Sequence, residues 1–290
     1  MRRGHLSKHT WLTCCQTSFR KNTISDSFIE TQTNQIPPTM SVVPRSVVIT
    51  GANRGIGLEL VRQLLTLTPT PVVIATARDP SKATQLQQLV TSHPNHVHVL
   101  ELEMTDYDDY SAIAGQVQTI LGPRGGLDLL VNNAGVYLPK TLDNLTHGDM
   151  MSVYKINSVA PLLFTRAMLP VLKLSSAHRP ANTAPQRTLV VNMSSSFGSI
   201  AGLAEGSAYE HRPSKTALNI FTRCLSIDLR PFGIQVLSIN PGWVQTDMGG
   251  IGALITSQQS VDAMLTKVIL NAGLELNGKF YSYDGSRLEW

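Results

Sequence analysis

Three glycines, Gly51, Gly55 and Gly57, follow a β-branched stretch ending at Thr50 and could hold a phosphate group. Glycine lets the backbone approach a ligand closely, and an apolar-patterned helix begins after this turn, near Leu58. The N–H groups at a helix N-terminus attract anions. This strand–turn–helix layout therefore predicts a site for the pyrophosphate of a dinucleotide.

The spacing of these glycines after a threonine resembles the turn of the short-chain dehydrogenase/reductase family. Other motifs of that family follow in its order: Asn132-Asn133-Ala134-Gly135, Asn157 in a helical pattern, Asn192-Met193-Ser194-Ser195, and Asn240-Pro241-Gly242-Trp243-Val244-Gln245-Thr246-Asp247. The resemblance runs from about residue 45 to the end of the chain. The last segments, Thr246–Gly250 and Asn277–Trp290, resemble the sniffer-like or C-factor-like carbonyl reductase branch.

The cofactor is expected to be NADPH rather than NADH. In NAD-binding proteins of this fold, an acidic side chain after the second strand binds the ribose 2′-hydroxyl. The resemblance puts that position at Ala77, which is apolar, and Arg78 follows it. With Arg54 in the glycine turn, two guanidinium groups can bind a 2′-phosphate through bidentate, charge-assisted hydrogen bonds. The alternative interpretation is that Arg78 is an ordinary solvated charge on a loop.

The resemblance implies further cofactor contacts. Glu103 and Met104 replace an Asp-Val pair beside the adenine, Asn132 would lie against the adenosine, and Thr246 would contact the nicotinamide carboxamide. The full expected set is Gly51, Asn53, Arg54, Gly55, Ile56, Gly57, Arg78, Glu103, Met104, Asn132, Lys215, Pro241, Gly242, Val244 and Thr246. We expect no metal site.

Carbonyl reduction also needs protein groups that polarise and protonate the carbonyl oxygen. The family uses a serine to hydrogen-bond the oxygen and a tyrosine to donate the proton. A lysine lowers the pKa of that tyrosine and binds the nicotinamide ribose, and an asparagine holds a water. By resemblance these roles fall on Ser195, Tyr209, Lys215 and Asn157.

The position of the tyrosine departs from the family pattern. Tyr209 lies six residues before Lys215 instead of four, and His211 takes the four-residue position. On a continuous helix, six residues correspond to about 240° of rotation, away from Lys215. Three interpretations stay open. Pro213 could start the helix and let Tyr209 reach the site from a bulge, His211 could donate the proton, or the chain could bind NADPH with little turnover, as a regulatory or scaffold protein.

Alternating strand and helix patterns must position these groups. Apolar runs predict strands at Ser46–Thr50, Val72–Ala77, Val97–Glu101, Leu127–Asn132, Leu189–Met193, Gln235–Asn240 and Gly278–Tyr281. Helical patterns cover Gly57–Leu67, Ser81–Ser92, Asp108–Leu121, His147–Leu172, Pro213–Leu229 and Ser260–Leu270. This alternation predicts an α/β fold, a doubly wound parallel sheet in a single Rossmann-type domain over residues 41–290, with a surface loop at Leu174–Arg187.

Composition limits the remaining possibilities. The net charge is +4, without a basic face carrying interleaved aromatic residues, so nucleic acid is not an expected partner. No apolar run reaches the roughly 18 residues of a membrane span, and three cysteines make no disulfide framework. Residues 1–40 are interpreted as a disordered extension, or as upstream of a start at Met40; a mitochondrial presequence is the alternative. We expect a cytoplasmic enzyme with a small-molecule carbonyl substrate, and a homodimer is one assembly that the family resemblance leaves open.

Overall fold

The computed structural model describes residues 41–177 and 188–290. Their main sheet has the strand order β10-β9-β6-β5-β4-β1-β2-β3 and is parallel except for the β9–β10 pair. The strands are β1 (Ser46–Ile49), β2 (Val72–Ala77), β3 (Val97–Glu101), β4 (Leu129–Asn132), β5 (Thr188–Met193), β6 (Ile234–Asn240), β9 (Phe280–Ser282) and β10 (Arg287–Leu288). Two short strands, β7 (Val244–Gln245) and β8 (Ile255–Thr256), pair separately. The predicted doubly wound parallel sheet is confirmed.

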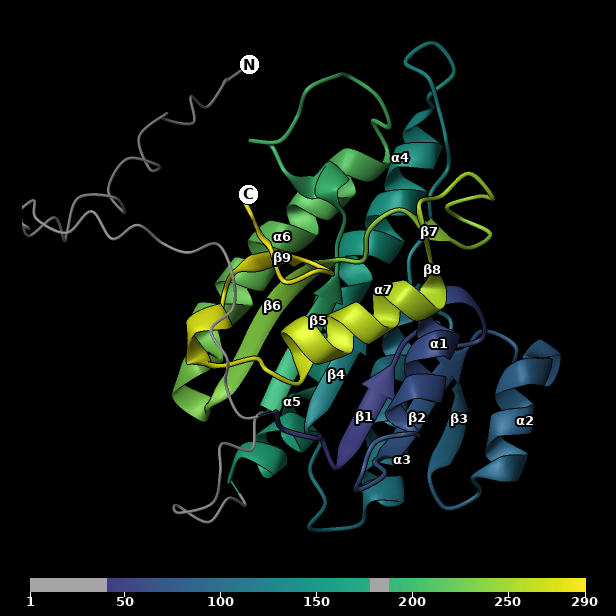
Figure 1. The fold of residues 1–290 in the computed structure, drawn as a ribbon, viewed down its shortest axis with the longest axis vertical. Helices are drawn as coiled ribbons and strands as arrows, with labels where there is room; N and C mark the ends of the chain where they lie inside the picture. Colours follow the sequence, from purple (N-terminus) through teal and green to yellow (C-terminus); the bar gives the residue numbers. More distant parts are fainter. Residues whose placement is uncertain (1–40, 178–187) are drawn as a thin grey trace, which may run out of the picture. The chain divides into compact units, whose positions relative to one another are not determined.

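Helices cover both faces of the sheet (Figure 1). One face carries α1 (Gly55–Leu64), α2 (Thr84–Ser92) and α7 (Ser257–Ala263), and the other carries α3 (Tyr110–Leu121), α5 (Ala160–Ala177) and α6 (His211–Asp228). The short α4 (His147–Tyr154) packs against α6. The alternation of side chains along β1 explains the two layers, because Val47 and Ile49 enter one core and Val48 the other.

Strand β1 pairs with β2 on one side and β4 on the other, so the strand order reverses there. Ligands of doubly wound sheets bind at such a reversal, beyond the carboxyl ends of the strands.

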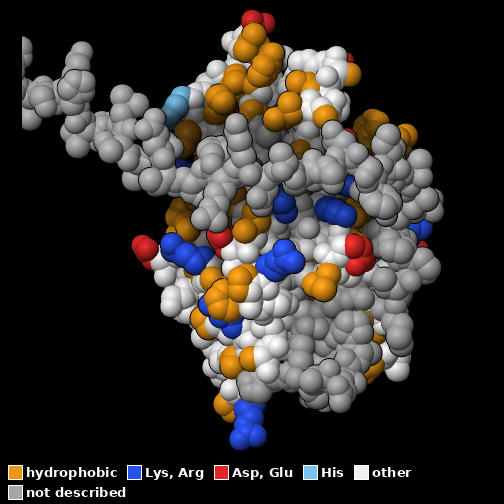
Figure 2. All heavy atoms as spheres, turned by 90° about the vertical axis from the view of Figure 1, so that its left-hand side faces the viewer, with side chains coloured by type: hydrophobic (Ala, Val, Ile, Leu, Met, Phe, Trp, Pro, Cys, Tyr) orange, Lys and Arg blue, Asp and Glu red, His pale blue; other side chains and the backbone are white. Residues whose placement is uncertain are grey.

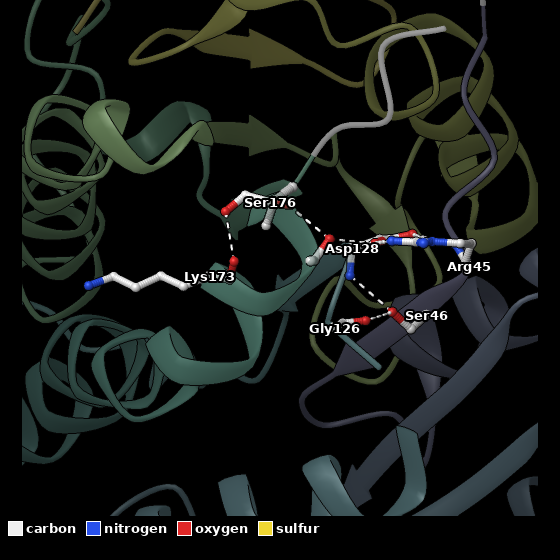
Figure 3. Close-up of polar contacts among 8 residues, drawn as sticks. Arg45, Ser46, Gly126, Asp128, Lys173 and Ser176 are labelled. Atoms are coloured by element: carbon white, nitrogen blue, oxygen red, sulfur yellow. Dashed lines mark hydrogen bonds and ion pairs between the residues drawn. The ribbon is translucent and has the colours of Figure 1, made fainter. Parts of the chain in front are cut away.

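A polar cluster fixes the opposite, amino-terminal ends of the same strands (Figure 3). The buried Asp128 accepts hydrogen bonds from Nε and Nη2 of Arg45 at 2.9 and 2.8 Å, and from Ser175 of α5. Ser46 donates to the carbonyl oxygen of Gly126. Burial by itself would raise the pKa of Asp128, but these hydrogen bonds outweigh it and lower the pKa. The cluster joins β1, β4 and α5, and so fixes the register of the strands that carry the site.

Three helix predictions need correction. The stretch expected to be one helix from His147 is interrupted by a π-helical turn at Lys155–Val159, and α5 continues to Ala177, inside the predicted loop. Helix α6 begins at His211, two residues before Pro213. The last helix ends in a second π-helical stretch, Met264–Ile269. The rest of the predicted loop and residues 1–40 lie outside the described residues.

One helical stretch, His147–Ala177, is long and apolar enough to cross a membrane, unlike the prediction from the sequence. Half of its most apolar window is buried inside the fold, as is typical of a core helix.

Candidate active site

The glycine turn joins β1 to α1 in the conformation that the sequence predicts. Gly51 and Gly55 have φ of +64° and +56°, which glycine adopts without strain. A Cβ on Gly57 would lie 2.5 Å from the carbonyl oxygen of Gly51, so the turn excludes a side chain there. Within the described residues, no side chain caps the N-terminus of α1. Its first N–H groups are therefore free of side-chain partners, as a phosphate site requires.

The segment after β4 holds this turn in place. Oγ1 of Thr50 accepts hydrogen bonds from the backbone N–H groups of Asn133 and Ala134, both at 3.0 Å. The Asn133 side chain donates to the carbonyl oxygens of Thr50 and Gly51. Sequence reasoning quoted Asn133 within a motif but gave it no role.

The Asn132 side chain points into the core. Its Nδ2 donates to Thr165 and Asn192, and the residue is 1% exposed. The Nδ2 group of Asn132 is thus occupied by partners on α5 and β5, and the expected contact with the adenosine stays a prediction.

The two arginines expected at a 2′-phosphate are both exposed, at the carboxyl ends of neighbouring strands. Arg54 forms an ion pair with Asp247, 2.6 Å between Nη1 and Oδ2. The adjacent Thr246 faces the glycine turn, since a Cβ on Gly55 would lie 3.3 Å from its Cγ2. Ala77 is buried, so no acidic group occupies the position that would repel a phosphate.

The other expected cofactor residues lie on loops at the same edge. Glu103 accepts hydrogen bonds from the N–H and hydroxyl of Thr105, and Met104 is buried. In the segment after β6, Gly242 has φ of +83° and would meet Ile255 and Tyr283 if it carried a Cβ. The remaining members of the set take these positions: Asn53 is exposed, Ile56 and Pro241 are half-buried, and Val244 is buried in β7.

Lys215 and Asn157 lie together at the end of β4. Nζ of Lys215 donates to the carbonyl oxygen of Met193 at 2.7 Å, and burial lowers the pKa of Lys215 to about 8. Asn157 lies in the π-helical turn. Its Oδ1 accepts a hydrogen bond from the N–H of Val136, and its Nδ2 donates one to the carbonyl oxygen of Val136. A Cβ on Gly135 would lie 3.2 Å from Oδ1 of Asn157 and 3.6 Å from Nζ of Lys215. Glycine therefore leaves space beside both groups.

The three serines after β5 are in different environments. Oγ of Ser194 is buried and donates to Asn219, while Ser196 is exposed. Ser195 is half-buried, and its Oγ accepts from the N–H of Phe197 at 3.1 Å. The hydroxyl proton of Ser195 is then free to be donated. Asn240 of β6 accepts from the N–H of Ser196 and so anchors this loop, a role that the sequence did not reveal.

His211, and not Tyr209, is brought into contact with Asn157. His211 is the first residue of α6, is 7% exposed, and has Nδ1 3.5 Å from Nδ2 of Asn157. Tyr209 precedes the helix, is 37% exposed, and has its hydroxyl beside Gly206. Immediately before Tyr209 the chain turns at Ala208, whose φ of 49° is costly for a residue with a Cβ. The expected helix start at Pro213, which would have allowed a bulge, is wrong.

Loops around these groups expose apolar side chains. Leu142 after β4 and Ile200 and Leu203 after β5 are at least half exposed. Figure 2 shows hydrophobic side chains gathered at its upper end, where the loop that precedes α4 and the loop that follows β5 lie in Figure 1.

Comparisons with known proteins show what the chain is similar to. Residues 45–251 match the family profile described as short chain dehydrogenase. Carbonyl reductase Sniffer of D. melanogaster has a similar structure, with a TM-score of 0.81 and 35% identity over 85% of this chain and 99% of that one. The NADPH-bound carbonyl reductase from chicken fatty liver also gives 0.81, with 41% identity over 87% of this chain and 96% of that one. C-signal of Myxococcus xanthus is 40% identical over 167 residues, 57% of this chain and 94% of that protein.

Proposed function

The chain belongs to the short-chain dehydrogenase family of oxidoreductases. We propose that it reduces the carbonyl of an aldehyde or ketone with NADPH, which is converted into NADP⁺. The observation that carries this proposal is the buried pair of Lys215 and Asn157 beside Gly135. Burying an ammonium group costs free energy, so a buried lysine in a candidate site indicates a functional role. This one lies at the same edge of the sheet as the uncapped glycine turn.

The residues present fit the cofactor. The N–H groups at the start of α1 would bind the pyrophosphate, Arg54 and Arg78 the 2′-phosphate, Thr246 the carboxamide, and Lys215 the nicotinamide ribose. NADPH supplies a hydride when it is bound. The name of the chicken liver relative, an NADPH-bound carbonyl reductase, supports the same choice of cofactor and reaction.

The protein's own part is to hold the substrate and manage its oxygen. The Ser195 hydroxyl donates a hydrogen bond to the carbonyl oxygen, which stabilises negative charge as it develops. The Lys215 ammonium adds positive charge to the same site. The exposed leucine and isoleucine side chains around the edge favour an apolar carbonyl compound.

The test has two parts. NADPH fluorescence measures cofactor affinity, and NADPH consumption is followed with benzaldehyde, octanal, acetophenone and 2-octanone. We expect binding of NADPH and measurable reduction within this panel, and a loss of at least 100-fold in kcat/KM for Lys215→Met. Absence of NADPH binding would contradict the proposal.

A second candidate function is an NADPH-binding protein with little turnover. The observation that favours it is Tyr209, which lies outside α6 and is partly exposed. This candidate predicts tight NADPH binding and no reduction of any compound in the panel, by the unmutated protein or by Lys215→Met.

A further inference from the structure

His211 lies on the side of α6 that faces the candidate site. It is one helical turn before Lys215, so the two side chains share a face of the helix. Its ring packs edge-on against Tyr137 and Phe197, with centroid distances of 5.2 and 6.2 Å. A polar ring held this way is fixed in orientation.

The partners of Nδ1 indicate which ring nitrogen carries the proton. Nδ1 of His211 lies 3.3 Å from the carbonyl oxygen of Val136, which can only accept, and 3.5 Å from Nδ2 of Asn157, which can only donate. The two protons of that amide nitrogen are already directed at the Val136 carbonyl oxygen and at Oγ of Ser214, at 2.9 and 3.1 Å. The proton of a neutral ring is therefore on Nδ1, and Nε2 keeps its lone pair. Nε2 forms no hydrogen bond with any residue in the described ranges.

We propose that Nε2 of His211 exchanges the proton with the substrate oxygen, and that the site consequently oxidises alcohols with NADP⁺ at neutral pH. This inference rests on the proposed function, because it needs the bound cofactor. It replaces the phenol expected at this place by a base that is ready to accept a proton.

The charges around the ring favour the neutral base. Burial lowers the pKa of His211 to about 4, and the positive charges of Lys215 and Arg212 act in the same direction, against a smaller opposing effect of the Val136 hydrogen bond. From the other elements packed against the ring come Tyr137, Phe197 and Asn157, which bring no carboxylate, ammonium or guanidinium group to it. At pH 7 the ring is then almost entirely unprotonated.

The oxidation step is balanced as follows. The O–H bond of the alcohol breaks, and its proton forms an N–H bond at Nε2. The C–H bond on the same carbon breaks, and its hydride passes to the nicotinamide ring of NADP⁺. The alcohol is oxidised to the carbonyl compound, the cofactor is reduced to NADPH, and the imidazolium releases its proton to water. In reduction the same nitrogen returns the proton, so reduction accelerates as the pH falls toward 4.

The first test needs no turnover. In ¹⁵N-histidine NMR spectra of the full chain with NADP⁺, the signals absent from His211→Ala identify this ring. We expect Nδ1 protonated and Nε2 bare from pH 8 down to about pH 5. An imidazolium, or a proton on Nε2, at pH 7 would overturn the inference. His147→Ala, an exposed histidine at the start of α4, is the control for the assignment.

The second test measures kcat/KM for oxidation of 1-phenylethanol and 2-octanol. We expect His211→Ala to lose at least 100-fold with unchanged affinity for NADP⁺, exogenous imidazole to restore part of the loss, and Tyr209→Phe to stay within twofold. Retained affinity shows that the variant folds. A wild-type rate that survives in His211→Ala, or a 100-fold loss in Tyr209→Phe, refutes only the role of His211. If the wild type binds NADP⁺ but turns over neither these alcohols nor the carbonyl panel, the proposed function fails as well.

Discussion

Arg54 and Asp247 form an ion pair between the glycine turn and the loop after β6, although Arg54 is also expected to bind the cofactor phosphate. Both side chains are largely exposed, so the pair is weak. The carboxylate of Asp247 is nevertheless a competitor for the guanidinium that a 2′-phosphate requires.

Removing this competitor should tighten NADPH selectively. Since exposed ion pairs contribute about 0.2–1 kcal/mol, we expect Asp247→Asn to lower the Kd of NADPH by about two- to fivefold. NADH lacks the phosphate, so its Kd should not change. Fluorescence titration measures both, and Asp108→Asn, an exposed acid next to α3, controls for net charge. Equal shifts for the two cofactors would refute the competition.

Cofactor preference itself depends on the two arginines. We expect NADPH to bind at least ten times more tightly than NADH, about 1.4 kcal/mol. Arg78→Asp should erase or reverse that preference, because a carboxylate repels the phosphate and binds the ribose hydroxyl. Equal dissociation constants for the two cofactors in the unmutated protein would contradict this prediction.

The buried Lys215 should make stability depend on pH. Its pKa is about 8 in the folded chain and 10.5 in an ordinary setting, so the unfolded chain binds more protons between these values. Unfolding free energy should therefore rise with pH from about 8 to 10.5, by up to about 3 kcal/mol. Lys215→Met should lack this rise. Urea unfolding of the cofactor-free protein at several pH values measures this rise. If the unfolding free energy changed with pH in the same way in the unmutated protein and in Lys215→Met, the predicted effect of burying Lys215 would be contradicted.

A chain that starts at Met40 should keep its melting temperature and cofactor affinity. Such a chain keeps the first described contacts with the domain, the hydrogen bonds of Ser41 to Asn271 and of Val42 to Leu270. Thermal unfolding and cofactor titration of the full chain and of the chain that starts at Met40 test this prediction. A drop of several degrees on truncation would show that residues 1–39 stabilise the domain.

Replacing His211 by the phenol that the family uses should raise the rate of carbonyl reduction. In His211→Tyr the phenol hydroxyl would lie beside the Lys215 ammonium, and this positive charge would lower the pKa of the phenol. We expect reduction of the carbonyl panel at pH 7 to rise at least tenfold. No change in His211→Tyr, with NADPH affinity intact, would mean that position 211 does not exchange the proton.

The sequence predicted the sheet well because strands that are buried on both faces are mostly apolar and β-branched, as at β1 and β2. It could not predict side-chain directions that depend on distant partners, such as Asn132, which bonds Thr165 and Asn192. The start of α6 was misplaced because proline fits the third helical position as well as the first. The first four N–H groups of a helix have no partner within the helix, so the missing N–H of Pro213 costs no helical hydrogen bond at either position. The cytoplasmic location and the homodimer stay predictions.

Transfer of deuterium from cofactor to substrate tests the central proposal most directly. The protein is incubated with NADPH deuterated on the transferred position of C4 and with the carbonyl panel, and the alcohols are analysed by mass spectrometry, which detects even slow turnover. The account predicts deuterium on the carbinol carbon, in amounts that fall at least 100-fold in Lys215→Met and increase as the pH is lowered from 8 to 5. Bound NADPH with no deuterium in any alcohol at any pH would contradict it.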